Sequence, residues 1–268
     1  MPPSVVDQPW YVHAFGPLYL TVYGHRDDAE ARRNAPRIAR LLGLKPHARI
    51  LDLACGEGRY TRAFAAMGHQ VTGLNLSEDL LAEAKARSPN LPGAPTYLRS
   101  DMREIPFFEQ FEAVVSLFTS FGYFDDRTDD EKVLEGAARA LVPGGRLLLD
   151  LPNPAQVRGG LVAANEEVRG TWHLRYERRM DDTTPAGPYV RKRIVVTDLR
   201  LGQVVGDIQE RVRLYAPDEL DRVLGLAGLE PEGARLGDFD GTLLSPTAPR
   251  LIRVARRPLG RRARRDGA

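Results

Sequence analysis

The sequence is poor in cysteine and contains no long apolar run. Its 268 residues include a single cysteine, Cys55, so an internal disulfide is excluded and a reducing compartment is expected. No apolar run approaches the roughly 20 residues that cross a membrane. The first residues lack the basic and apolar regions of a signal peptide. We therefore expect a cytoplasmic protein without a membrane partner.

A strong net charge is also missing. The 38 basic and 36 acidic residues leave a formal charge of +2, which by itself gives no reason to expect nucleic acid. Basic residues gather instead in a tail at residues 257–268. Such a tail can bind phosphate, but a solvated chain end has the same composition. We expect no nucleic-acid partner and keep RNA binding through the tail as an alternative.

Short apolar runs and helical patterns alternate through the first part of the chain. The runs that predict strands lie at residues 48–54, 70–74, 95–100, 111–118 and 146–151. Strands that alternate with helices indicate a parallel sheet covered on both faces. Two further strand-like segments end the fold near Arg256. The sequence therefore predicts an α/β fold with a Rossmann-like, doubly wound, seven-stranded sheet.

The pattern changes after Pro152, where polar and apolar residues begin to alternate. Period two recurs in residues 171–180, 189–199 and 204–215, which predicts about three antiparallel strands inserted after the fifth parallel strand. Residues 10–42, by contrast, have an amphipathic helical pattern with many aromatics. The chain is thus expected to consist of an N-terminal helical lid (1–45), a Rossmann-like core (46–152), an antiparallel β insertion (153–215), the C-terminal part of the core (216–256) and the basic tail (257–268).

A glycine-containing turn follows the first predicted strand, in LDLACGEGRYT. Gly56 and Gly58 let the backbone approach a ligand, and the following helix offers unpaired N–H groups. Asn75 ends the next strand, nineteen positions after Gly56. That is close to the roughly 20-residue spacing at which dinucleotide-binding folds place a ribose-binding acid.

Two kinds of ligand compete for this turn. A nicotinamide or flavin dinucleotide would favour a third glycine where Thr61 stands. The carboxylates of Asp52 and Glu57 beside the turn suit an ammonium or hydroxyl ligand better than a pyrophosphate.

Together the motifs resemble a known family. ILDLACGEGRYT, VTGLNLS, LRSDMREIPF, FEAVVSLFTSFGYF and LVPGGRLLLDLPNP follow in the order and spacing of class I S-adenosylmethionine-dependent methyltransferases. The resemblance covers about residues 20–152 and is weaker in RLYAPDELDRVLGLAGL. It implies S-adenosylmethionine as cofactor and methyl transfer to nitrogen or oxygen of a small molecule. The alternatives are an RNA methyltransferase and a protein that binds the cofactor without transferring a methyl group.

The resemblance also implies a set of cofactor-binding residues. They are Tyr23, Asp52, Ala54, Cys55, Gly56, Gly58, Asn75, Leu76, Asp101, Met102, Leu117 and Phe118. In this set Asp52 and the glycine loop would hold the methionine amine and carboxylate. Ala54 replaces a frequent glycine, and Asn75 replaces the acid that accepts from the ribose hydroxyls. An amide can still accept those bonds, without the strength that a charge adds.

The remaining residues of the set would surround the adenine and the methyl group. Leu76 would lie beside the adenine, Asp101 would accept from its amino group, and Met102 would stack on the ring. Leu117 and Phe118 would line the path to the methyl group, and the aromatic lid would close over the cofactor.

No strict catalytic constellation is expected, because the protein mainly positions a nucleophile beside an activated methyl group. The candidates for a general base are His25, Tyr23 and Tyr123, for which packing of the lid is the ordinary alternative. The paired aspartates lack His or Cys at ligand spacing, so no metal site is expected.

The insertion is expected to cover the active site or to make a homodimer contact. Aromatic residues at Trp10, Phe121, Tyr123 and Phe239 predict a mostly apolar pocket.

Overall fold

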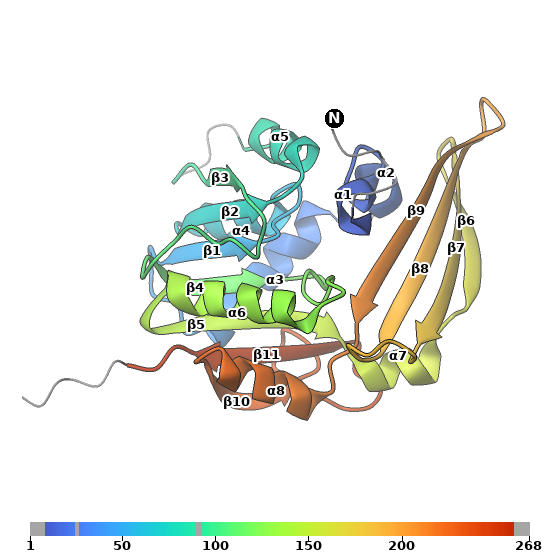
Figure 1. Ribbon diagram of the computed structural model, residues 1–268. Helices are drawn as coiled ribbons and strands as arrows, with labels where there is room; N and C mark the ends of the chain where they lie inside the picture. Colours follow the sequence, from blue (N-terminus) through green and yellow to red (C-terminus); the bar gives the residue numbers. More distant parts are fainter. Residues whose placement is uncertain (1–8, 25–26, 89–92, 260–268) are drawn as a thin grey trace, which may run out of the picture.

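The computed structural model of the protein describes residues 9–24, 27–88 and 93–259, which form two sheets with helices around them (Figure 1). The larger sheet has the strand order β10-β11-β5-β4-β1-β2-β3. Its strands are β1 (Arg49–Leu53), β2 (Gln70–Asn75), β3 (Thr96–Arg99), β4 (Phe111–Ser116), β5 (Leu141–Pro152), β10 (Glu230–Leu236) and β11 (Arg250–Arg256).

Five of these strands run parallel, and β11 lies antiparallel to β5. The chain starts in the middle at β1, continues outward to β2 and β3, and then returns to β4 on the other side of β1. This order creates a switch point between β1 and β4, where open α/β sheets bind ligands at the carboxyl ends of their strands. The predicted Rossmann-like, seven-stranded sheet is confirmed.

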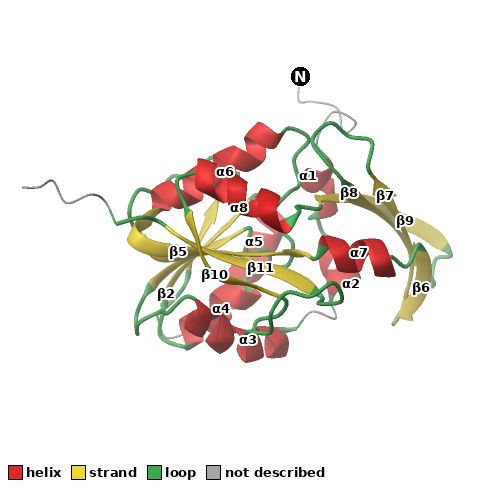
Figure 2. Ribbon diagram, turned by 90° about the horizontal axis from the view of Figure 1, so that it is seen from below, coloured by secondary structure: helices red, strands yellow, loops and turns green. Residues whose placement is uncertain are grey.

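Helices cover both faces of this sheet because its strands are apolar on both sides. Figure 2 shows α3 (Asp28–Leu41) and α4 (Arg59–Ala66) on one face, with α6 (Arg127–Ala140) and α8 (Pro217–Leu226) on the other. The helix α5 (Glu78–Ala86) packs beside β2 and β3, and Ser77 caps it as its sequence predicts.

The smaller sheet is antiparallel and contains four strands, one more than the pattern predicts. Its strands are β6 (Ala164–Arg169), β7 (Trp172–Asp181), β8 (Tyr189–Asp198) and β9 (Gln203–Arg213). The extra strand, β6, has five exposed residues in succession, so it lacks the alternation that marks a half-buried strand. A short helix, α7 (Pro154–Gly160), precedes it, capped by Asn153.

The N-terminal lid is divided into three helices instead of one continuous pattern. Two short helices, α1 (Trp10–Ala14) and α2 (Tyr19–Tyr23), precede α3. They lie between the larger sheet and the insertion (Figure 1). Ala14 and Val22 of these helices form a core with the fully buried Leu174, Ile194 and Val196 of the insertion. The lid therefore joins the two sheets and closes the space between them.

Glycine allows the strand β2 to lie close to the loop after β1. A Cβ atom on Gly73 would lie 2.8 Å from the sulfur of Cys55 and 3.1 Å from the hydroxyl oxygen of Thr61. In a dinucleotide-binding fold, a third glycine at the start of the helix allows the helix to pack closely against the strand. Here Gly73 of β2 allows the same close approach from the strand side. Thr61 is therefore compatible with a close-packed ligand loop.

Within the described residues, none of the helices has both the length and the apolar character needed to cross a membrane.

Candidate active site

The loop after β1 is built from backbone conformations that favour glycine. Ala54, Gly56 and Gly58 have φ angles of +58°, +58° and +78°. For a residue with a Cβ atom this region costs about 1–2 kcal/mol, so the alanine at position 54 carries strain that a glycine would not. The amide of Cys55 donates to the carbonyl of Leu74, which ties the loop to β2.

Asp52 lies beneath this loop and is almost completely buried. Its side chain accepts a hydrogen bond from the hydroxyl of Thr61 at 2.6 Å. Burial raises the pKa of Asp52 to about 6, although the Thr61 hydrogen bonds oppose the change. A desolvated carboxylate favours a cationic ligand, which agrees with the predicted contact to the methionine amine. Burial likewise raises the pKa of the Cys55 thiol, which suits a packing role and not a nucleophile.

Asn75 ends β2 beside the loop, and its side-chain nitrogen is unsatisfied. Asn75 is 9% exposed, and its Nδ2 is buried with no hydrogen-bond partner in the described part of the chain. A buried donor without a partner costs about 1–3 kcal/mol. The oxygen of a ribose hydroxyl would satisfy this nitrogen, which adds a donor to the acceptor role that the resemblance implies for the amide oxygen.

Asp101 follows β3 and is already engaged by a neighbour that the sequence analysis missed. Arg103 donates to both oxygens of the Asp101 carboxylate, at 2.7 and 3.1 Å, and also to Asp129 at 2.9 Å. Burial alone would raise the pKa of Asp101, but the hydrogen bonds from Arg103 outweigh it and lower the pKa. Asp101 is therefore held ionised and can only accept hydrogen bonds, as the predicted adenine contact requires.

The turn after β4 contains two successive strained residues. Phe118 and Thr119 have φ angles of +55° and +66°, which are uncommon without glycine. Asp150 holds this turn, since its carboxylate accepts from the Phe118 amide at 2.8 Å and its carbonyl from the Thr119 amide at 3.0 Å. Arg250 in turn donates to the Asp150 carboxylate at 2.7 Å. Strain maintained in this way is typical of functional sites.

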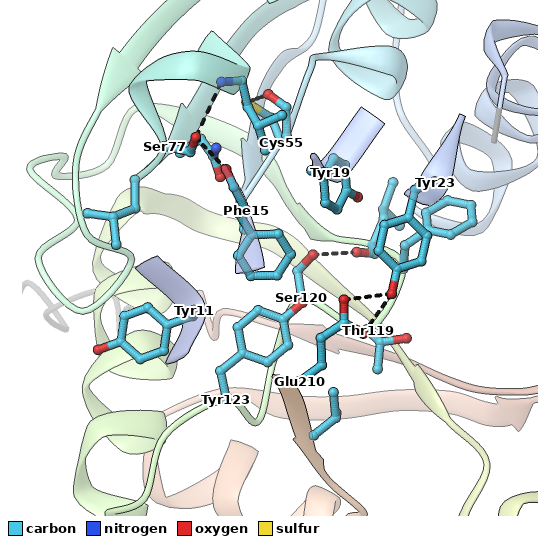
Figure 3. A pocket seen from close by; sticks show the side chains of 18 of the residues that line it. Tyr11, Phe15, Tyr19, Tyr23, Cys55, Ser77, Thr119, Ser120, Tyr123 and Glu210 are labelled. Carbon is cyan, nitrogen blue, oxygen red and sulfur yellow. Dashed lines mark hydrogen bonds between the residues drawn. The ribbon is translucent and has the colours of Figure 1, made fainter. Parts of the chain in front are cut away.

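These elements surround one cavity of about 1290 Å³ between the sheet edge, the lid and the insertion (Figure 3). Every predicted cofactor-binding residue lines it except Gly58, whose α-carbon faces Tyr97 behind the loop. Ligand pockets usually measure about 300–1000 Å³. The cavity is therefore large enough for a nucleoside cofactor and a second molecule.

The lid provides an aromatic wall to this cavity. Trp10, Phe15 and Tyr123 all line it, and the rings of Phe15 and Tyr123 stack with their centroids 5.6 Å apart (Figure 3). The prediction that Phe121 and Phe239 line the pocket is wrong, because both are buried in the core.

Of the three candidate bases, Tyr23 and Tyr123 line the cavity, whereas His25 lies outside the described residues. The catalytic roles of all three remain predictions.

The insertion supplies polar groups that the sequence analysis missed. Lys192 and Glu210 line the cavity and stand opposite each other in the β8–β9 register. Both occupy positions on the face that otherwise presents Ile194, Val196 and Ile208 to the lid. The sequence did contain a signal for them. In strands where polar and apolar residues alternate, Lys192 and Glu210 stand at positions where the alternation predicts an apolar residue.

In the described part of the chain, no group of three or more His, Cys, Asp or Glu side chains is arranged to hold a metal ion.

Asn75 variants test where the ribose lies. Asn75→Leu should weaken S-adenosylmethionine binding by roughly tenfold or more, since it removes the hydrogen bonds to a hydroxyl. Asn75→Asp should preserve or tighten binding. Isothermal titration calorimetry measures both affinities. The free energy of unfolding should not fall in Asn75→Leu, because Nδ2 has no partner to lose. If the leucine variant binds the cofactor as tightly as the native protein, the ribose lies elsewhere.

Asp52 should make the stability of the ligand-free protein depend on pH. Its folded-state pKa is raised above the ordinary 3.8, so the folded protein binds this proton more tightly than the unfolded chain. Stability should therefore decrease as pH rises from about 4 through about 6, by about 3 kcal/mol from this group. Asp52→Asn should remove that decrease and be more stable than the native protein at pH 7.5.

Urea unfolding at a series of pH values measures this dependence. Burial also raises the pKa of Asp130 to about 6, and the pKa of His69 is lowered, so the difference in slope between the native protein and Asp52→Asn is the quantity that reports on Asp52. Equal slopes in the two proteins would mean that Asp52 is not desolvated.

Comparison with known proteins agrees with this geometry. The family described as "Methyltransferase domain" matches residues 50–145. A dTDP-3-amino-3,6-dideoxy-alpha-D-glucopyranose N,N-dimethyltransferase of Streptomyces fradiae is 29% identical over 217 residues, which are 78% of this chain and 78% of that protein. A 27-O-demethylrifamycin SV methyltransferase of Amycolatopsis mediterranei is 32% identical over 160 residues, which are 55% of this chain and 56% of that protein.

Among solved structures, the CcbJ methyltransferase from Streptomyces caelestis matches with a TM-score of 0.77 and 21% identity, over 91% of this chain and 98% of that chain. At that identity the likeness concerns the fold alone. The chain spans less than two thirds of the length of several curated relatives, 42%, 41% and 56% in three of them. The predicted cofactor and the predicted antiparallel insertion in a Rossmann-like fold are confirmed, and residues 50–145 of the chain match a methyltransferase domain.

Proposed function

We propose that the protein transfers a methyl group from S-adenosylmethionine to a nitrogen or oxygen atom of a small molecule. The observation that carries this proposal is that one cavity is lined both by the predicted cofactor-binding residues of the sheet and by residues of the insertion. Its volume of about 1290 Å³ leaves room for an acceptor beside a nucleoside cofactor.

The residues at the sheet edge would hold the cofactor by complementary chemistry. Asp52 would bind the methionine amine, Asn75 the ribose hydroxyls, and Asp101 with Met102 the adenine. When bound, S-adenosylmethionine supplies a methyl group already activated on a sulfonium, so that in-line attack by the acceptor requires little further chemistry from the protein.

The other contribution of the chain is positioning and exclusion of water. The aromatic wall of Trp10, Phe15 and Tyr123 shields the cavity, and the strained turn at Phe118 is held in one geometry by Asp150. An acceptor fixed between these groups would react at a high effective concentration.

The relatives favour a small acceptor, and nitrogen ahead of oxygen. The Streptomyces fradiae relative, which the chain matches over most of its length, is named for N,N-dimethylation of a nucleotide-linked amino sugar. The Amycolatopsis mediterranei relative is named for methylation at an oxygen position of rifamycin and is matched over a shorter part. We therefore propose an amine-bearing small molecule as the first acceptor to test and a hydroxyl-bearing one as the second.

RNA methylation through the basic tail is the alternative that the structure favours less. Arg257, the first residue of the tail, donates to the carbonyl of Leu141 and to Glu109 at 2.7 Å, so it caps the end of α6. The remainder of the tail, residues 260–268, lies outside the described residues. A homodimer through the insertion and a cytoplasmic location likewise remain proposals.

A transfer assay tests the proposed function. The protein is incubated with S-adenosylmethionine carrying a labelled methyl group and with nucleotide-linked amino sugars, their hydroxyl counterparts, other small amines and total RNA. We expect label in an amine-bearing small molecule. Label in RNA alone would contradict the proposal, and cofactor binding without transfer to any acceptor would favour a binding protein.

A further inference from the structure

The cavity face of the insertion carries a row of charged residues where apolar residues are expected. Arg178, Lys192 and Glu210 are cross-strand neighbours on β7, β8 and β9, and all three line the cavity. Elsewhere on this face the strands present Ile194 and Val196 to the lid. Charged residues placed on an otherwise apolar face are costly, so such a row points to a ligand.

Glu210 is the centre of a hydrogen-bonded group that connects the insertion with the lid. The hydroxyl of Tyr23 lies 2.7 and 2.6 Å from the two carboxylate oxygens of Glu210, to which it donates (Figure 3). Lys192 donates to the same hydroxyl oxygen at 2.7 Å. The side chain of Glu210 is 13% exposed. Tyr23 and Lys192 thus fix the carboxylate at the cavity wall.

Acceptor capacity remains on this carboxylate. An ionised carboxylate offers about four lone-pair sites, and Tyr23 has only one hydroxyl proton to share between the two oxygens. The Lys192 ammonium lies 3.5 Å from Glu210, and the rings of Tyr23 and Tyr176 also lie beneath it, at 4.7 and 5.1 Å. The charge of Lys192 is thereby shared among internal partners, which leaves Glu210 able to receive an external donor.

We propose that Glu210 receives the protonated amine of the acceptor and removes one of its protons. This assignment rests on the proposed function. The N–H bond of the ammonium breaks, its electron pair remains on nitrogen as the lone pair needed for attack, and the proton passes to a carboxylate oxygen of Glu210. Solvent at the cavity mouth later takes the proton and restores the carboxylate.

An amine fits this position better than an anion does. Among the described residues of the insertion that line the cavity, Glu210 provides the one carboxylate, and the ring of Tyr19, which also lines the cavity, can attract a cation. Arg178 at the other end of the row would repel an ammonium, whereas the charge of Lys192 between them is shared by Glu210 and the rings of Tyr23 and Tyr176. The remaining carboxylates of the lining, such as Asp52 and Asp101, belong to the cofactor side.

Matched amines and alcohols test the assignment by binding. Three skeletons are used, each as the amine and as the corresponding alcohol: a nucleotide-linked hexose, a free hexose and a phenylethyl group. Each is titrated calorimetrically into the full chain, with and without S-adenosylhomocysteine. The native protein should prefer the amine of at least one skeleton by roughly tenfold or more, as a charge-assisted hydrogen bond predicts.

Glu210→Gln should abolish this preference, since the amide keeps the shape and the bond from Tyr23 but loses the charge. Glu177→Gln is the matched control, because Glu177 pairs with Arg175 and Arg193 on the outward face of the same sheet. It should leave the preference intact.

The results separate this assignment from the alternatives. If no amine is preferred, or if the preference survives in Glu210→Gln, the assignment is wrong. A purely structural Glu210 would leave the amine-to-alcohol ratio unchanged in Glu210→Gln, even where the affinity for S-adenosylhomocysteine changes. Failure of the protein to bind S-adenosylhomocysteine would contradict the proposed function. The titration with S-adenosylhomocysteine is separate from the titrations with amines and alcohols, so the two failures can be told apart.

Discussion

Desolvation of the Asp52 carboxylate at the end of β1 is the constraint on which the site depends. A buried carboxylate is unfavourable unless a partner compensates it, and Thr61 supplies only neutral hydrogen bonds. The strained Ala54, the unsatisfied nitrogen of Asn75 and the strained turn at Phe118 lie around the same cavity. Unfavourable features concentrated at one sheet edge are characteristic of a site whose geometry serves a ligand.

The site has two halves that meet at Tyr23. The sheet provides backbone loops and carboxylates suited to a cationic, nucleoside-type cofactor, whereas the insertion provides a charged row on an otherwise apolar face. Tyr23 belongs to the lid and donates to Glu210 of the insertion, so these hydrogen bonds connect the lid to the wall that the insertion contributes to the cavity. This arrangement explains why a short helix and a distant antiparallel sheet are both needed for one cavity.

Local signals predicted the parallel sheet and the residues that line the cavity at its edge. Apolar runs, a glycine turn and the spacing to Asn75 depend on neighbouring residues in sequence, and those residues meet at one edge of the sheet. The roles of residues in the insertion were harder to predict. Whether Lys192 and Glu210 face the cavity or the solvent depends on which face of the antiparallel sheet packs against the lid. Phe121 shows the same limit: its position after the β4 turn is local, but its burial depends on Tyr215, which lies between β9 and α8, far away in the chain.

Calorimetric titration of the full chain with S-adenosylhomocysteine and, separately, with NADH tests the central claim most directly. The desolvated carboxylate of Asp52 and the buried amide of Asn75 line the same cavity. The account predicts saturable binding of S-adenosylhomocysteine with one site per chain and no comparable binding of NADH. Binding of NADH in preference to S-adenosylhomocysteine, or binding of neither, would contradict it.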